Sequence, residues 1–181
     1  MSKKNVRRIG VILMIGAVVL LLLLFPRISK RVSEPAQAVM TAMFTAPDDS
    51  KIDDTVWPLN GPALTEQERM EMEARTKAVL HNWEAAVGSY FCDGGLNNFL
   101  LSGPGLRFHL IAKDRGVKSS LSSMALLEKT DRYESVLATV LIGSTFHDIH
   151  VTFRYNPDGK IYKVVVDEDI NGLFEEAEAC A

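Results

Sequence analysis

Cysteine is scarce in this chain, and neither copy stands where a lipid anchor needs one. The 181 residues include two cysteines, Cys92 and Cys180. Neither directly follows the apolar run near the N-terminus, which argues against a bacterial lipid anchor. Outside the cytoplasm two cysteines are more often joined than free, so this pair is a candidate disulfide. Two unrelated thiols are the alternative.

Acidic residues are absent from the start of the chain. All 23 Asp and Glu residues lie at or beyond Glu34, whereas residues 1–31 hold seven of the 20 Lys and Arg residues. The remainder has 13 basic against 23 acidic residues, a net charge of −10. Nucleic acid and anionic lipid surfaces repel a body this acidic, so we expect no nucleic-acid partner.

Charge is also missing from one long stretch, the 17 residues Ile9–Phe25. At about 1.5 Å per residue a helix of this length spans roughly 26 Å, slightly less than a hydrocarbon core of about 30 Å. Flanking Arg8 and Arg27 can extend to the headgroups. We expect a single-pass anchor in the cell membrane's lipid bilayer, with a cytoplasmic N-terminus and an extracytoplasmic body. A cleaved signal is the alternative, although its Ala-x-Ala motif at 36–38 lies far downstream.

Four segments follow from these patterns. They are 1–31, a cytoplasmic tip, anchor and basic flank; 32–63, a stalk or linker; 64–166, an α+β domain; and 167–181, an acidic tail. The stalk includes one short predicted helix, with Ser33 as its N-cap. That helix would bring Val39, Met40, Met43 and Phe44 to one side, to pack on the domain or to face a partner.

The 64–166 segment predicts an α+β fold in which a long helix packs on a four-stranded antiparallel meander. A capping box at Thr65–Glu68 begins the helix, and Gly94–Gly95 ends it. Four strand-like runs follow, separated by short turns such as Asn156–Gly159. In the third run the alternation puts His147 and His150 on opposite faces, so they cannot share a metal ion.

Three polar residues of the third run form a candidate site on the open face of the sheet. They are Asp148, His150 and Arg154, which alternation brings to one side. No nucleophile or second base stands at a defined spacing from them. The pattern therefore favours a solvated sheet face over a catalytic pocket, and we expect that the chain is not an enzyme.

The acidic segment Asp167–Glu178 matches the twelve-residue calcium loop of EF-hand proteins. That loop takes oxygen ligands from positions 1, 3, 5, 7, 9 and 12 and has Gly at position 6. The ligands here would be Asp167, Asp169, Asn171, the Leu173 carbonyl, Glu175 and Glu178. Calcium is thus the one candidate cofactor. An acidic C-terminal helix with solvated carboxylates is the alternative, because a strand precedes the loop and three residues follow it.

The order of elements resembles the nuclear transport factor 2-like (cystatin-like α+β) fold. It is similar above all to the anchored extracytoplasmic versions, among them an inner-membrane assembly component of bacterial type IV secretion systems. The resemblance covers residues 65–166 and rests on order and period, so it assigns no functional residue. It implies a scaffold or binding role. We expect a non-catalytic, membrane-anchored domain that binds a protein partner or a small ligand. A calcium-stabilised module and a pocket enzyme around His150 and Arg154 are the alternatives.

Overall fold

The computed structural model of the chain describes residues 31–52 and 65–179. These residues belong to one compact unit, Arg31–Ala181. The predicted bilayer-spanning run Ile9–Phe25 lies outside the described residues. Within them, no helix is both long enough and apolar enough to cross a membrane.

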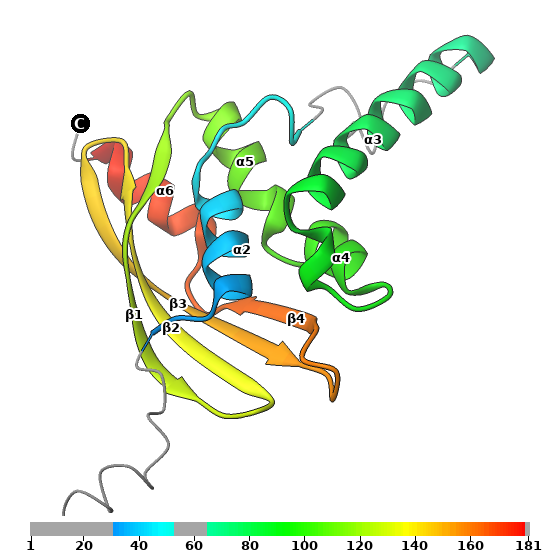
Figure 1. Cartoon of the computed structure of the whole chain (residues 1–181). Helices are drawn as coiled ribbons and strands as arrows, with labels where there is room; N and C mark the ends of the chain where they lie inside the picture. The colour runs from blue at the N-terminus through cyan, green and yellow to red at the C-terminus, as the bar shows by residue number, and fades with distance from the viewer. Residues whose placement is uncertain (1–30, 53–64, 180–181) are drawn as a thin grey trace, which may run out of the picture. The chain divides into compact units, whose positions relative to one another are not determined.

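One layer of the unit is a four-stranded antiparallel sheet with the order β1-β2-β3-β4 (Figure 1). The strands are β1 Ser119–Lys129, β2 Tyr133–Ile142, β3 Thr145–Tyr155 and β4 Ile161–Val166. The turn between β3 and β4 forms where predicted, because the Asn156 side chain accepts hydrogen bonds from the backbone N–H groups of Asp158 (3.1 Å) and Lys160 (2.8 Å). The predicted meander is confirmed.

The sheet has one buried face and one open face. On β3, Asp148, His150 and Arg154 are exposed, whereas the alternate residues are buried: His147, Ile149, Val151, Phe153 and Tyr155. The same alternation continues on β2, where the fully buried positions are Glu134, Val136, Ala138, Val140 and Ile142. The predicted facing of β3, with His147 and His150 on opposite sides, is therefore confirmed.

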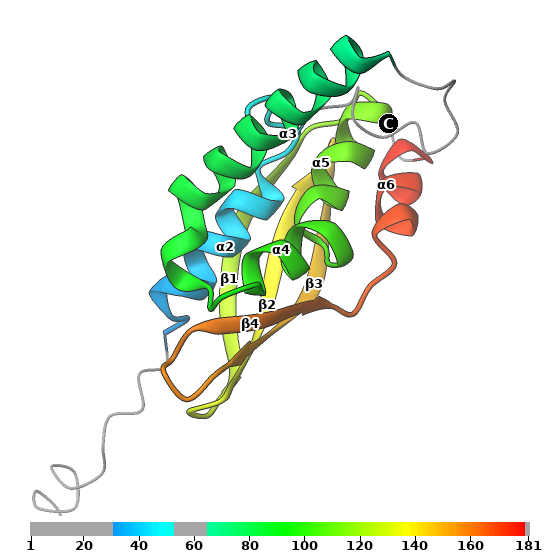
Figure 2. The ribbon, with the colours of Figure 1, turned by 90° about the vertical axis from the view of Figure 1, so that its right-hand side faces the viewer.

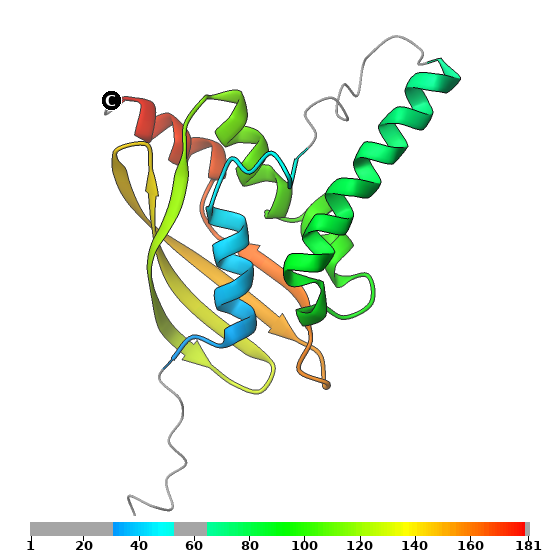
Figure 3. The ribbon, with the colours of Figure 1, turned by 45° about the horizontal axis from the view of Figure 1, so that its top comes forward.

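The helix expected in the stalk, α2 (Glu34–Phe44), is part of the hydrophobic core. It contacts β1 (Figure 3), and its buried stripe includes the fully covered Val39, Met40, Met43 and Phe44. Because this stripe recurs every three to four residues, the helix presents one continuous apolar side to the sheet. The packed unit thus begins at Arg31, earlier than the predicted boundary at residue 64.

The long helix α3 (Glu66–Val87) starts at the predicted capping box. The Thr65 hydroxyl oxygen accepts from the Glu68 N–H (3.2 Å), and a Glu68 carboxylate oxygen accepts from the Thr65 N–H (2.7 Å). Helices pack on the four-stranded sheet as predicted, but α2 provides a larger contact with it than the long helix does. The long helix contacts α2, buries Trp83 and Val87, and projects its exposed first half away from the sheet (Figure 1). The reason is composition, because the first half is dominated by charged residues.

Three further helices complete the helical layer. After a short 3-10 turn, η1 (Gly88–Tyr90), the chain forms α4 (Gly95–Asn97), the π-helical turn η2 (Asn98–Ser102) and α5 (Gly105–Asp114). The C-terminal helix α6 (Ile170–Ala179) contacts α5 and β2, and its Phe174 is fully buried. In Figure 2, β4 runs at the border of the sheet, below α4 and α5. The segment predicted as a tail therefore belongs to the core.

A buried carboxylate, Glu134 on β2, holds the start of α2. It accepts hydrogen bonds from the Ser33 N–H (2.7 Å), the Ser33 hydroxyl (2.6 Å) and the Tyr155 hydroxyl (2.9 Å). The Lys129 ammonium lies 3.5 Å from it. Burial, with the neighbouring carboxylate, raises the pKa of Tyr155. A fully buried carboxylate with three donors and a cation satisfies the requirement that buried charge be paired.

His109 of α5 links that helix to the end of α2. Its Nε2 lies 2.9 Å from the Ala42 carbonyl oxygen, and its Nδ1 accepts from the Asp48 N–H at 3.1 Å. This pattern requires the neutral imidazole with its proton on Nε2, and burial lowers the pKa of His109 accordingly. His109 is fully buried, because α5 packs against α2 at this position.

Candidate functional site

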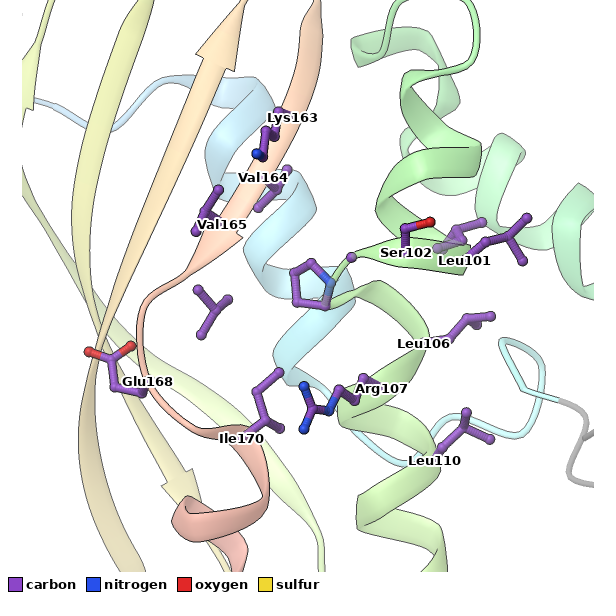
Figure 4. Close-up of a pocket in the computed structure, with 14 residues that line it drawn as sticks. Leu101, Ser102, Leu106, Arg107, Leu110, Lys163, Val164, Val165, Glu168 and Ile170 are labelled. Carbon is purple, nitrogen blue, oxygen red and sulfur yellow. The ribbon is translucent and has the colours of Figure 1, made fainter.

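A groove with a volume of about 530 Å³ separates the edge strand β4 from η2 and α5 (Figure 4). The apolar side chains that line it come from both sides, and they include Leu100, Leu101, Leu106, Leu110, Val164 and Ile170. Leu101 is 58% exposed, although most large apolar side chains of the unit are covered. A concave surface that combines apolar side chains with a small number of placed polar groups is the usual form of a binding site.

Two glycines allow the chain to turn tightly from η2 into α5. A Cβ on Gly103 would lie 2.7 Å from the Phe99 carbonyl oxygen, and a Cβ on Gly105 would lie 2.7 Å from a Phe99 ring carbon. Both distances are shorter than side chains tolerate, so glycine is required for this close approach. The turn places Leu100 and Leu101 of η2 beside Leu106 of α5, and thereby builds the helical wall of the groove.

The groove contains few charges. Arg107 reaches from α5 toward Ile170 (Figure 4), and its guanidinium lies 3.8 Å from the Asp169 carboxylate. Glu168 turns toward β3, since its Oε1 accepts from the His150 N–H at 2.8 Å. The Arg107 side chain is half exposed and thus accessible to a ligand. A guanidinium in apolar surroundings is suited to a carboxylate, which it can bind with two parallel hydrogen bonds.

The predicted polar cluster lies on the open face of the sheet, away from this groove. Asp148, His150 and Arg154 are all exposed, and the Asp148 carboxylate accepts from the Thr139 hydroxyl at 2.8 Å. Among the described residues, no hydrogen bond or ion pair joins any two of the three. Alternation brings them to one side of β3, but it does not gather them around a common point.

The predicted calcium segment is helical over much of its length. Asp167 and Asp169 precede α6, whereas Asn171, Leu173, Glu175 and Glu178 lie within it. Asp169 caps the helix, since its carboxylate accepts from the Asn171 N–H at 3.2 Å, and Glu175 pairs with Arg115 at 3.1 Å. In the described part of the chain, no three His, Cys, Asp or Glu side chains are grouped to hold a metal. A calcium loop would require α6 to unwind, and the ion site stays a prediction.

The two cysteines are placed unequally. Cys92 is half-buried two residues after the η1 turn, with its sulfur 3.7 Å from the Asp93 carbonyl oxygen. Cys180 lies outside the described residues. The disulfide between them therefore stays a prediction.

Comparison of the chain with protein-family models, curated proteins and solved structures returns no match. The resemblance to the nuclear transport factor 2-like fold thus rests on the order of helices and strands. The groove beside β4 was not predicted, because its two walls are more than 50 residues apart in the chain. The one local signal was the apolar run Phe99–Leu101, directly before Ser102-Gly103-Pro104-Gly105.

Proposed function

We propose that this chain is a single-pass membrane protein whose extracytoplasmic α+β domain binds a protein partner in the groove beside β4. The observation that carries the proposal is the groove itself, an open surface of apolar side chains with two exposed cations, Arg107 and Lys163. In this proposal the domain has a scaffold or assembly role and catalyses no reaction. A small ligand is the other occupant that such a groove admits.

The exposed apolar side chains of the groove support a protein partner. Leu101 is 58% exposed to solvent, and Leu110, Val165 and Val166 of the groove are partly exposed, whereas its other apolar residues are buried. Isolated exposed leucines are common on protein surfaces, whereas a contiguous and concave group marks an interaction site. A partner that covers Leu101 would remove this apolar surface from water, which is the main driving force of protein association.

The sequence of the N-terminal region supports the anchor. The uncharged run Ile9–Phe25 ends eight residues before Ser33, whose backbone Glu134 holds. A run of this length with basic residues on both sides is typical of a membrane-spanning helix. In this proposal the folded domain follows the bilayer after a very short connection, so its partners act at or near the membrane surface.

Site-specific photo-crosslinking of the full chain in its native membrane tests the proposed function. A photoreactive amino acid replaces Leu101 in the groove or, as a matched control, Leu127 of β1, which is 51% exposed. We expect an adduct of one discrete mass at position 101 and none at position 127. Adding Arg107→Glu should abolish that adduct, whereas Arg154→Glu on the open face should leave it unchanged. Equal adducts at both positions, or none at position 101, would contradict the proposal.

A further inference from the structure

The side of β4 that faces the groove is a partly unpaired sheet edge. β4 is the last strand of the sheet, and β3 pairs with its other side. At the start of β4, Phe91 forms a parallel bridge with Ile161, and the Cys92 N–H donates to the Ile161 carbonyl oxygen at 3.0 Å. Beyond Ile161 the chain that follows Cys92, which forms α4 and η2, stays beside β4 but forms no ladder with it. From Val164 to Val166 no described residue forms a further bridge with this side of β4.

The backbone groups that face the groove belong to Val164 and Val166. The Asp167 N–H donates to the His150 carbonyl oxygen at 3.2 Å, which fixes the direction of that residue toward β3. Alternate residues of an antiparallel strand direct their backbone polar groups to opposite sides. The register Val151–Val166 and Phe153–Val164 is unbroken here, so Val166 and Val164 direct their N–H and C=O groups away from β3. The edge thus directs two donors and two acceptors toward the groove, from Val166, which is partly exposed, and from Val164, which is 5% exposed.

The helical wall of the groove stands beside the β4 edge. Opposite β4, η2 and the start of α5 line the groove with Leu100, Leu101 and Pro104. A single peptide strand needs about 4.8 Å beside its neighbour. Its alternate side chains would contact these apolar residues, and the others would point to the open face near Lys163.

The charges of the groove favour an acidic peptide as its ligand. The charged lining residues are Arg107, Lys163 and Glu168, which give the lining a net charge of +1. Lys163 and Arg107 are the two cations near a ligand, and the Arg107 guanidinium lies 3.8 Å from the Asp169 carboxylate. From residue 32 onward the chain carries a net charge of −10, so an acidic peptide is repelled elsewhere on the surface and attracted here.

We propose that the partner enters this groove as one extended, acidic peptide segment, which pairs with Val164 and Val166 of β4 as a fifth strand. This inference rests on the proposed function, and names the kind of partner and its mode of binding. Strand addition of this kind takes affinity from main-chain hydrogen bonds and specificity from alternate side chains.

A library of short random peptides is the first probe, selected for binding to the full chain in detergent. We expect the selected peptides to contain Asp or Glu and apolar residues at alternate positions. Replacing one backbone N–H at a time by N-methyl should then weaken binding about tenfold at every second position, because each such N–H donates to β4, and little at the positions between. Uniform tolerance of N-methylation would overturn strand addition.

The matched protein variants are Val166→Pro and Val166→Ala. Proline removes the N–H that faces the groove without removing a bond to β3, and edge strands accept proline at such positions. Alanine removes side-chain volume but keeps the N–H. We expect Val166→Pro to lower the affinity for the selected peptide about tenfold, and Val166→Ala to lower it much less. Equal affinities of the two variants would overturn the inference.

The remaining outcomes separate this inference from the proposed function. If the adduct at position 101 forms while Val166→Pro binds peptide like the unmodified chain, the groove binds its partner without strand addition. A concentration-dependent dimer that Val166→Pro abolishes would assign the edge to a second copy and overturn the peptide. If neither an adduct nor a selected peptide is obtained, both proposals fail.

Discussion

The two edges of the sheet differ in how they are closed to other strands. At the β1 edge, Ala46 and Ser119 exchange backbone hydrogen bonds of 3.2 and 2.7 Å, and β1 then carries two register shifts, at Leu121/Ser123 and at Leu126/Glu128. At the β4 edge one bridge covers Ile161, and the strand from Val164 to Val166 stays regular beside the groove. Each edge is thus closed at one end only.

The two edges show two ways of limiting the pairing of an edge strand with another chain. Bulges disturb the even spacing of backbone donors and acceptors, and so discourage pairing with another chain. β1 has two such irregularities along its length, whereas the corresponding stretch of β4 has none. Instead, η2 and α5 stand beside β4 and restrict which chain can reach it. The bulges thus discourage another strand from pairing with β1. The helices beside β4 instead restrict which chain can pair with that edge.

The largest expected effect concerns Phe44, which lies beside the Ala46–Ser119 pairing that closes one end of the β1 edge. Phe44 is fully buried, packs edge-to-face on Phe108 at 4.9 Å, and accepts the Ser119 hydroxyl at its carbonyl oxygen. Phe44→Ala should lower the free energy of unfolding by about 3–5 kcal/mol, as large cavities in cores do. Leu101→Ala in the groove should cost less than about 0.5 kcal/mol. Chemical denaturation measures both, and similar costs would contradict the contrast between the two regions.

A smaller loss of stability is expected when a substitution at Glu134 releases the start of α2. Glu134→Gln replaces one carboxylate oxygen by an N–H₂ group that faces donors from Ser33 and Tyr155. An unsatisfied buried polar group costs about 2 kcal/mol. Glu128→Gln on β1, which is exposed, is the control and should be nearly neutral. If Glu134→Gln were equally neutral, the buried cluster would not hold α2.

The cap of α6 distinguishes the helical tail from a calcium loop. Asp169→Ala removes the carboxylate that accepts the Asn171 N–H, and should lower stability by about 1 kcal/mol. Asp167→Ala removes no cap and should be nearly neutral. Thermal melts in calcium, in magnesium and in chelator provide the measurement. A calcium-specific rise in Tm that Asp167→Ala abolishes would instead establish the ion site that the sequence pattern predicts.

The smallest expected effect is a change in the slope of Tm against pH when His109 is replaced. Burial lowers its pKa below the ordinary 6.5, so the unfolded chain binds a proton more readily than the folded one. Stability from this residue is therefore complete above about pH 6.5 and is lost as the pH falls below that value. The fall in Tm on acidification should be shallower in His109→Gln. His81→Gln, on the exposed face of α3, should keep the original slope, and identical slopes for all three chains would contradict a buried neutral His109.

The sheet could be predicted from sequence because its signals are local. Alternation along β3 and the Asn156–Gly159 turn each depend on neighbouring residues, and both appear where predicted. The capping box of α3 is equally local. Such patterns determine the elements and the faces that they bury, but they do not determine which elements meet.

The parts that sequence did not predict depend on contacts between distant residues. The Val39–Phe44 stripe predicted an apolar helix side, but not that this side would cover the sheet in place of α3. Glu134 alternates with the apolar residues of β2, which was a usable signal for a buried carboxylate, although its partner Ser33 lies 101 residues earlier. The groove needs η2 and β4 together. The apolar run Phe99–Leu101 is a local signal, but it does not show that β4 lies opposite it.

Amide hydrogen exchange at β4, followed by NMR in the full chain with and without a selected acidic peptide, tests the central claim most directly. In the free chain, the N–H groups of Val164 and Val166 should exchange fast, while those of Val165 and Asp167 are protected by their bonds to β3. Addition of the peptide should protect Val164 and Val166 and leave the other two unchanged. Protection of Val164 and Val166 already in the free chain, or no change when the peptide binds, would contradict the account of β4 as an open edge that receives a strand.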